Sequence, residues 1–188
     1  TVTFAVGKKT QVITFGDGSS QAATGSLALG ASSNASTNNA GMGNMTYVVS
    51  ASGNTANCSI SGGINLAFTQ SGTCNVTATK TGNGNWTDAN KTAAFTIAKS
   101  SRTVRIKPKS ESTGSFDPSG YASWDLSGPT LDPATSASDT GDTYTYSTET
   151  DSQGCTVNSS TGAVSFVSAG LCKLHVVVSE GAVYGSAT

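Results

Sequence analysis

Apolar and polar residues alternate along two stretches of the chain that lie about a hundred residues apart. In the first stretch, Cys74, Val76 and Ala78 fall on one face of an extended strand, whereas Asn75 and Thr77 fall on the other. The second follows the same rule, with Cys172, Leu174, Val176 and Val178 on one face and Lys173 and His175 on the other. Alternation with period two predicts half-buried strands of an antiparallel sandwich.

Short runs rich in Gly, Asn and Ser separate the alternating stretches and indicate tight turns. They are GDGSS at 16–20, SGG at 61–63, TGNGN at 81–85 and SSTG at 159–162. A chain poor in Leu, Glu and Lys also disfavours helix. We therefore expect an all-β fold of sandwiches with about seven strands each.

The second half of the chain repeats the first at a shift of 97 or 98 residues. The matched pairs are Tyr47 and Tyr144, Cys58 and Cys155, Ile60 and Val157, Leu66 and Val164, Phe68 and Phe166, Gly72 and Gly170, Cys74 and Cys172, Val76 and Leu174, and Trp86 and Tyr184. A match in register over about 40 residues indicates an internal repeat. We therefore predict two tandem domains, which span residues 8–98 and 99–188.

The segment 95–110 joins the two copies. It ends the first copy with Phe95 and Ile97 and begins the second with Val104 and Ile106. The start of the chain matches this junction at a shift of 91 residues, which places Phe4 on Phe95, Val6 on Ile97 and Lys8 on Lys99. Residues 1–7 are therefore predicted to be the last strand of a preceding copy or a donor strand, with Val2, Phe4 and Val6 as its apolar residues.

At the other end, Ala187 and Thr188 match Ala89 and Asn90, immediately before the last strand of the first copy. The second domain is therefore predicted to lack its own last strand. A spare strand and a missing strand are complementary, as in filaments where each subunit completes the next by strand addition. The alternative is that these residues are a window cut from a longer repeat array, and both interpretations remain open.

The order of these residues resembles the bacterial Ig-like repeats that occur in tandem along large surface proteins and adhesins, in a variant with a cysteine pair. The resemblance is carried by Cys58, Ile60, Leu66, Phe68, Gly72, Cys74, Val76, Gly84, Asn85, Trp86, Ala89, Phe95 and Ile97. The second copy has Ala182 and Val183 in place of the Gly-Asn pair. The resemblance implies tandem immunoglobulin-like sandwiches that act as stapled spacers and not as enzymes, although one such fold hosts many roles.

The four cysteines form one widely spaced pair in each copy. Zinc sites need four converging ligands and usually contain closely spaced cysteines, which these pairs lack. Each cysteine lies two residues before an inward aliphatic residue, so both thiols of a copy face the same interior. We predict the disulfides Cys58–Cys74 and Cys155–Cys172, which favour an oxidising compartment and an extracellular, cell-surface or secreted location.

Composition excludes two classes of partner. Charged residues make up 11% of the chain and the net charge is −1, so neither a nucleic-acid footprint nor an anionic-membrane footprint is supported. The longest aliphatic run, 176–178, is far too short to span a bilayer. We predict no membrane span in this segment and no cofactor.

Catalytic motifs are weak. Asp139, Thr140 and Gly141 match the Asp-Thr-Gly of aspartic proteases, but they lie in a polar stretch without a second such motif, so we interpret them as a solvated turn. His175 is on the outward face and no nucleophile is placed near it by a motif, so we interpret it as a surface residue. We therefore predict that the chain is not an enzyme.

Charged groups at the junction and in the second copy allow further interpretations. Five cations, Lys99, Arg102, Arg105, Lys107 and Lys109, crowd the junction, where they fit a solvent-facing strand edge or a basic hinge against the acidic second copy. The scattered carboxylates Asp17, Asp117, Asp139, Asp142 and Asp151 have no calcium-loop order, so no metal site is assigned.

We predict a non-catalytic extracellular structural protein, a segment of a surface adhesin, fibre or filament that joins other copies head-to-tail or abuts neighbouring Ig-like repeats. The alternative is a module that binds carbohydrate or a host-surface ligand, with the candidate contact aromatics Trp86, Tyr121, Trp124 and Tyr146. Seven Asn-x-Ser/Thr sequons are candidate N-glycosylation sites: Asn34, Asn44, Asn57, Asn75, Asn85, Asn90 and Asn158.

Overall fold

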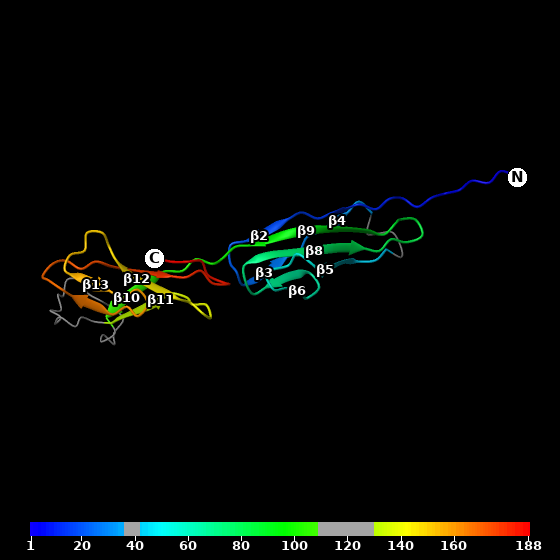
Figure 1. Cartoon of the computed structure of the whole chain (residues 1–188). Coiled ribbons are helices and arrows are strands. Elements are labelled where there is room, and N and C mark those ends of the chain that lie inside the picture. Colours follow the sequence, from blue (N-terminus) through cyan, green and yellow to red (C-terminus); the bar gives the residue numbers. More distant parts are fainter. Residues whose placement is uncertain (36–41, 109–129) are drawn as a thin grey trace. The chain divides into compact units, whose positions relative to one another are not determined.

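The structure is a computed structural model that describes residues 1–35, 42–108 and 130–188 (Figure 1). Within these residues every regular element is a β-strand, which confirms the predicted all-β class. The chain divides into two compact units, unit 1 at Thr1–Ser100 and unit 2 at Ser101–Thr188.

Unit 1 contains a four-stranded sheet in which β8 and β9 are the central strands. Its order is β2 (Gly18–Ser20), β9 (Ala89–Ile97), β8 (Gly72–Lys80) and β5 (Met45–Val49). The β8 strand pairs antiparallel with β9 along its whole length and with β5 along its second half. The short edge strand β2 runs parallel to β9.

A second, three-stranded sheet lies across the core from the first. Its order is β3 (Gly25–Ala28), β7 (Asn65–Phe68) and β6 (Cys58–Ser61), and all its pairings are antiparallel. A separate two-stranded pair, β1 (Ile13–Thr14) with β4 (Ser32–Ser33), adds Ile13 to the same core. Unit 1 is therefore a sandwich of two sheets around one apolar core.

The alternation in the sequence determines which side chains fill this core. Cys74, Val76 and Ala78 on β8 are fully buried, and Phe95 on β9 packs beside them. Leu66 and Phe68 approach from β7 in the opposite sheet. The predicted inward face of β8 is thus confirmed, because period-two alternation places every second residue on the core side of the sheet.

Unit 2 is built from three antiparallel pairs of strands. They are β10 (Val104–Pro108) with β11 (Leu131–Thr135), β12 (Tyr144–Thr148) with β15 (Leu174–Val178), and β13 (Cys155–Val157) with β14 (Val164–Phe166). Its buried core consists of Leu131, Tyr146, Val164 and Val176. Val178 is also fully buried, so the predicted inward register of β15 is confirmed at both of these valines.

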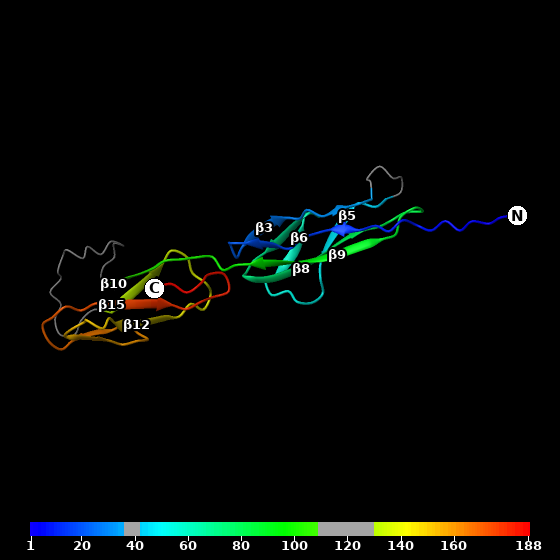
Figure 2. The same ribbon diagram turned by 90° about the horizontal axis from the view of Figure 1, so that it is seen from above.

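Residues 1–8 leave unit 1 as an extended segment that joins neither sheet (Figure 2). The first backbone contact of this end of the chain is the bridge from Lys9 to Trp86. The segment is therefore attached to unit 1 only at its C-terminal end.

Gly72 begins β8 at a point where a side chain would not fit. Its φ is +140°, and a Cβ added there would lie 2.3 Å from Thr55 Oγ1 and 2.9 Å from the Thr55 carbonyl carbon. The close approach lets the Thr73 amide donate a 2.8 Å hydrogen bond to Thr55 Oγ1. Gly72 thus joins the start of β8 to the loop that precedes β6.

We expect Gly72→Ala to lower the free energy of unfolding of unit 1 by about 2 kcal/mol, because it strains the backbone and displaces Thr55. Gly84→Ala is the matched control, since a Cβ added at Gly84 would meet open space within 4 Å, and it should change stability by less than about 0.5 kcal/mol. Hydrogen exchange mass spectrometry in denaturant measures both units separately. Equal effects of the two substitutions would contradict this account.

Candidate functional site: the disulfide clamps and the open edge of unit 2

The disulfide of unit 1 joins its two sheets. Cys58 lies on β6 and Cys74 lies on β8. The two cysteines are 16 positions apart in the sequence, and their Cα atoms are 6.0 Å apart. Cys74 is fully buried and Cys58 is half-buried. The bond is therefore a covalent link across the core of the sandwich, between the same cysteines that the repeat pairs.

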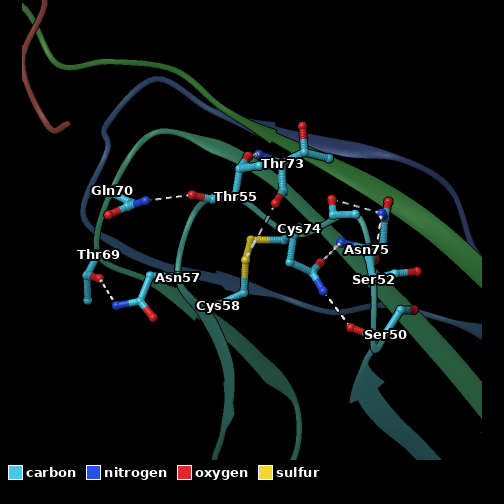
Figure 3. Close-up of a disulfide and its surroundings, with 12 residues drawn as sticks. Ser50, Ser52, Thr55, Asn57, Cys58, Thr69, Gln70, Thr73, Cys74 and Asn75 are labelled. Carbon is cyan, nitrogen blue, oxygen red and sulfur yellow. Dashed lines mark hydrogen bonds between the residues drawn. A yellow bond between two sulfur atoms is a disulfide. The ribbon is translucent and has the colours of Figure 1, made fainter. Parts of the chain in front are cut away.

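A polar network surrounds this disulfide (Figure 3). The Asn54 Oδ1 accepts a 2.6 Å hydrogen bond from the Asn75 amide, and the Asn54 Nδ2 donates to the Ser50 carbonyl at 2.5 Å. The Asn75 Nδ2 donates in turn to the Gly53 carbonyl at 3.1 Å. These bonds fix the loop between β5 and β6 against β8, so that Cys58 is held opposite Cys74.

Unit 2 has its own disulfide in the equivalent place. Cys155 begins β13, Cys172 lies just before β15, and their Cα atoms are 5.7 Å apart. The bond thus connects the β13–β14 sheet to the segment that leads into the β12–β15 sheet. Cys155 and Cys172 are both half-buried, as Cys58 is in unit 1. Cys74, the counterpart of Cys172, is fully buried.

The difference in cysteine burial coincides with an open sheet edge. In unit 2, β15 pairs antiparallel with β12 as β8 pairs with β5, but Tyr146 lies opposite Val176 where Tyr47 lies opposite Ala78, so the sequence match of Tyr47 with Tyr144 is wrong by two residues. On its other edge, β8 is paired with β9 over nine residues, but within the described residues β15 has only the bridge from Val178 to Ala187. That bridge corresponds to the pair of β8 and β9 nearest their connecting loop, Lys80 with Ala89.

The two units also differ in local structure and in burial beside this edge. Residues 170–173 correspond to the first four residues of β8 but are not in a strand. Leu174 and Phe166 are half-buried, whereas their counterparts Val76 and Phe68 are 0% and 3% exposed. One side of the apolar core of unit 2 is therefore less covered than the same side of unit 1.

The N-terminal segment presents unpartnered apolar side chains. Val2, Phe4 and Val6 are 77%, 83% and 95% exposed. They occupy alternate positions, so they lie on one face when the segment is extended.

Arg102 is not on a solvent-facing edge, which corrects that interpretation of the junction cations for this residue. Its side chain is fully buried, and its Nη1 donates to Asp142 Oδ2 at 2.6 Å while its Nε donates to the Gly185 carbonyl at 2.9 Å. Its guanidinium also lies 5.8 Å from the centre of the Tyr184 ring. Its pairing with Asp142 agrees with the other interpretation, in which cations of the junction contact the acidic second copy.

The ion pair shifts both titrating groups. The hydrogen bond from Arg102 lowers the pKa of the Asp142 carboxyl below its ordinary value of 3.8, and the opposing effect of burial is smaller. The same bond raises the pKa of the Arg102 guanidinium. Asp142 therefore remains ionised through the neutral range, which satisfies the buried cation.

The Asp-Thr-Gly segment is a turn, as expected, but its carboxylate is not simply solvated. Gly141 has a φ of +88°, and Asp139 Oδ2 accepts hydrogen bonds from the amides of Val183 and Tyr184 at 3.1 and 2.9 Å. Asp139 is half-buried, and these bonds attach the turn to the C-terminal segment. The role of the motif in the structure is to hold that segment in place.

The candidate ligand-contact aromatics do not form one surface. Tyr146 is in the core of unit 2 at 5% exposure, and burial raises the pKa of its hydroxyl, so its assignment as a ligand contact is wrong. Trp86 is half-buried, with Lys9 Nζ 5.7 Å from the centre of its ring. Tyr121 and Trp124 lie outside the described residues.

Candidate metal and catalytic groups are also dispersed. In the described ranges, no three His, Cys, Asp or Glu side chains are grouped so that they could hold a metal ion. His175 is half-buried on β15, opposite Ser147. Asp117 and Lys109 lie outside the described residues, and of the other carboxylates Asp17 accepts a hydrogen bond from the Ala94 amide.

The sequons fall into two groups. Asn44, Asn85 and Asn90 are exposed in unit 1. The side chains of the other four make hydrogen bonds that hold loops or turns, and these are Asn34, Asn57, Asn75 and Asn158.

Known proteins provide little further information. No protein-family model matches the chain, and no curated protein matches its sequence. The resemblance to bacterial Ig-like repeats therefore stays a prediction. No helix among the described residues is long and apolar enough to cross a membrane.

Solved structures that align with the chain include Drosophila N-cadherin EC1-4 at 9% identity and a TM-score of 0.31, over 90% of this chain and 45% of that one. Protocadherin gammaB7 EC3-6 aligns at 13% identity and a TM-score of 0.34, over 90% and 47%. The protocadherin gammaB4 extracellular domain aligns at 16% identity and a TM-score of 0.34, over 94% and 33%. The chain thus spans less than half of each, and scores this low transfer neither fold details nor activity.

Removal of either disulfide by paired Cys→Ser substitutions is expected to lower the free energy of unfolding of its own unit by about 3 kcal/mol, because loops of this size gain that much entropy when opened. The Cys155–Cys172 bond should also be reduced first, since neither of its cysteines is fully buried. Thermal unfolding with and without reductant measures the first effect, and thiol labelling measures the second. Earlier labelling of Cys58 and Cys74 would contradict the burial argument.

Unit 2 should lose stability as the pH falls below about 4. The pKa of Asp142 is lower in the folded state, so its contribution is complete above the unfolded value of 3.8 and decreases as the carboxyl protonates. Asp142→Asn should remove this contribution and lower stability at neutral pH by about 3 kcal/mol, because Arg102 stays buried without a counter-charge.

Asp151→Asn provides the matched control for the acid prediction. Asp151 pairs with Lys173 in solvent, with side chains that are 58% and 41% exposed, so its loss should leave the unfolding midpoint of unit 2 at neutral pH unchanged. Unfolding followed by hydrogen exchange of unit 2 peptides distinguishes the two variants. A larger effect of Asp151→Asn than of Asp142→Asn would refute the role of the buried pair.

Proposed function

We propose that the chain is a non-catalytic structural segment of an extracellular surface protein, such as an adhesin, a fibre or a filament, in which two Ig-like domains act as tandem spacers. The observation that carries this proposal is that each unit has its own disulfide, which joins the two sheets in unit 1 and joins the β13–β14 sheet to the segment before β15 in unit 2. Such bonds form and persist in oxidising compartments, which supports a location outside the cytoplasm.

The clamps suit a spacer for a kinetic reason. Covalent links between sheets limit how far a unit opens, so proteases and mechanical load act on a smaller part of the chain. The outer face of the β5–β8–β9 sheet is held by side-chain bonds such as Thr77 Oγ1 to Thr92 Oγ1 at 2.8 Å. These features add rigidity to the unit.

The finer form of the proposal concerns how copies join. Head-to-tail self-association by donor-strand complementation is supported by the open edge of β15 and by the exposed apolar residues of the N-terminal segment. Adjacent Ig-like repeats of one longer chain would use the same surfaces. In either arrangement the partner is another module of this kind.

The alternative function, a carbohydrate-binding module, has weaker support. Of its four candidate aromatics, Tyr146 is buried and Trp86 is half-buried below Lys9. A glycan array tests the alternative directly, with Trp86→Ala and Trp124→Ala as variants. We expect no binding, and binding that either substitution abolishes would favour the ligand-binding module.

Antibodies raised against the chain are expected to label intact source cells or the fibres attached to them, because the proposed location is extracellular. Immunogold electron microscopy without permeabilisation measures this. An antibody against a cytoplasmic protein of the same cells is the control and should not label. Labelling only after permeabilisation would overturn the proposed function.

A further inference from the structure

Building on the spacer role proposed above, on which this inference rests, we propose that the parallel pairing of β2 with β9 is the force-bearing contact of unit 1 when the chain is under tension. The chain reaches this pairing through residues 9–20 and leaves it through the end of β9. Tension along the chain therefore pulls the two segments past each other, and unit 1 resists extension for as long as the contact holds.

The first segment of unit 1 runs beside its last strand in one direction and one register. Lys9 forms a parallel bridge with Trp86, and β2 pairs in parallel with Phe95–Ile97. Both contacts, like the hydrogen bond between Asp17 and Ala94, join residues that are 77 positions apart. The two segments therefore lie side by side from the connection between β8 and β9 to the end of β9.

The chain enters and leaves unit 1 at opposite ends (Figure 1). The pairing of β8 with β9 extends from Ala89 at one end to Ile97 at the other, which is about 30 Å for strands of nine residues. Lys9 lies beside the connection between these strands, at the end where Ala89 is located. A force transmitted through the chain thus acts along the two segments in opposite directions and loads the parallel pair in shear.

Shear makes the hydrogen bonds of the pair share the force. When two strands are pulled apart from the same end, their pairs break one at a time, and each bond carries the whole force in its turn. In shear the bonds must lengthen together before the strands move, and the even spacing of hydrogen bonds in a parallel pair suits this distribution. The lifetime under force is set by the barrier to unfolding, so a small contact in the force path outweighs larger contacts outside it.

Hydrogen bonds reinforce the pair on both sides of its ladder. The Asp17 Oδ1 accepts a 2.7 Å bond from the Ala94 amide, immediately before the first pair of the ladder. The Ser20 carbonyl accepts a 2.8 Å bond from the Ala98 amide, immediately after the last pair. The bond to Asp17 has a charged acceptor, and bonds of this kind are stronger than those between neutral groups.

Gly18 allows the two strands to approach at the core. A Cβ added at Gly18 would lie 2.7 Å from two carbons of the Phe95 ring, which is buried at 6% exposure. Phe95 packs in turn against Phe15, with ring centroids 5.7 Å apart. Movement of β2 along β9 would therefore disturb a buried aromatic pair as well as the hydrogen bonds, which raises the barrier to sliding.

Single-molecule force spectroscopy of the full chain in two pulling geometries tests the proposal. Handles on Thr1→Cys and Ser101→Cys load unit 1 in shear and leave unit 2 attached but outside the force path. Handles on Gln21→Cys and Ser101→Cys follow the pair at the same end, so they peel β2 from β9. The three positions are exposed, and the native cysteines are all in disulfides, so the added thiols are labelled selectively.

At equal force, unit 1 should unfold at least about tenfold sooner when it is peeled than when it is sheared, because the hydrogen bonds of the pair then break in sequence. The lifetime of the folded unit at constant force measures this difference. Equal lifetimes in the two geometries, or a longer lifetime in the peeling geometry, would overturn the proposal.

Asp17→Ala tests the reinforcing bond, and Asp88→Ala is its matched control. Both aspartates are exposed and accept a 2.7 Å hydrogen bond from a backbone amide, but the partner of Asp88 is Gly82, within the connection between β8 and β9. In shear, Asp17→Ala should shorten the lifetime about tenfold, as the loss of one hydrogen bond to a charged group predicts, and Asp88→Ala should leave it unchanged.

Equilibrium unfolding in denaturant separates this effect from a general loss of stability. Because the two bonds are alike, both substitutions should shift the unfolding midpoint of unit 1 by a similar amount at zero force. A difference between the variants that is present only in shear supports the force-bearing role. Equal lifetimes of the two variants in shear would contradict it.

These outcomes are separate from those that test the proposed function. Equal lifetimes in shear and in peeling would remove the force-bearing contact and leave the extracellular structural role to the surface-labelling experiment. Labelling inside cells only would overturn that role even if the parallel pair resists shear.

Discussion

The antiparallel pairing of β8 with β9 is the interaction on which the sandwich depends. It extends over nine residue pairs in unit 1, and it brings Phe95 and Ile97 over Cys74 and the start of β8. The two units share their disulfide position and the antiparallel pairing of β5 with β8 or of β12 with β15. Where it is reduced to one bridge, the strand shortens and the core beside it is less buried.

The disulfides have a different role from this pairing. They connect the sheets on the side of β6 and β13, where in unit 1 the loop network of Asn54 and its neighbours already fixes the chain. A sheet partner covers apolar area along a whole edge, whereas a disulfide constrains one point and acts mainly on the unfolded chain. The disulfide and the sheet pairing therefore stabilise a unit in different ways.

Local alternation and the repeat made much of the fold predictable, because both depend on residues close in sequence or matched between copies. The inward face of β8 follows from Cys74, Val76 and Ala78 alone. Tyr146 was misplaced because the sequence match paired Tyr47 with Tyr144, whereas the strand pairing puts Tyr146 at the position of Tyr47. The burial of Arg102 could not be read in this way, because its partner Asp142 is forty residues away and has no counterpart in the first copy.

The two copies solve one structural problem by different chemistry. Each must attach its first segment to the loop that follows β8 or β15. Unit 1 does so with neutral bonds, in which the amide of the 4% exposed Gln11 donates to Thr87 Oγ1. Unit 2 has Arg102 at the matched position, where it donates to one carboxylate and three carbonyls. Because the attachment in unit 2 requires an ionised carboxylate at Asp142, this contribution to the stability of unit 2 is lost as the pH falls, whereas the matched bond of Gln11 contains no titrating group.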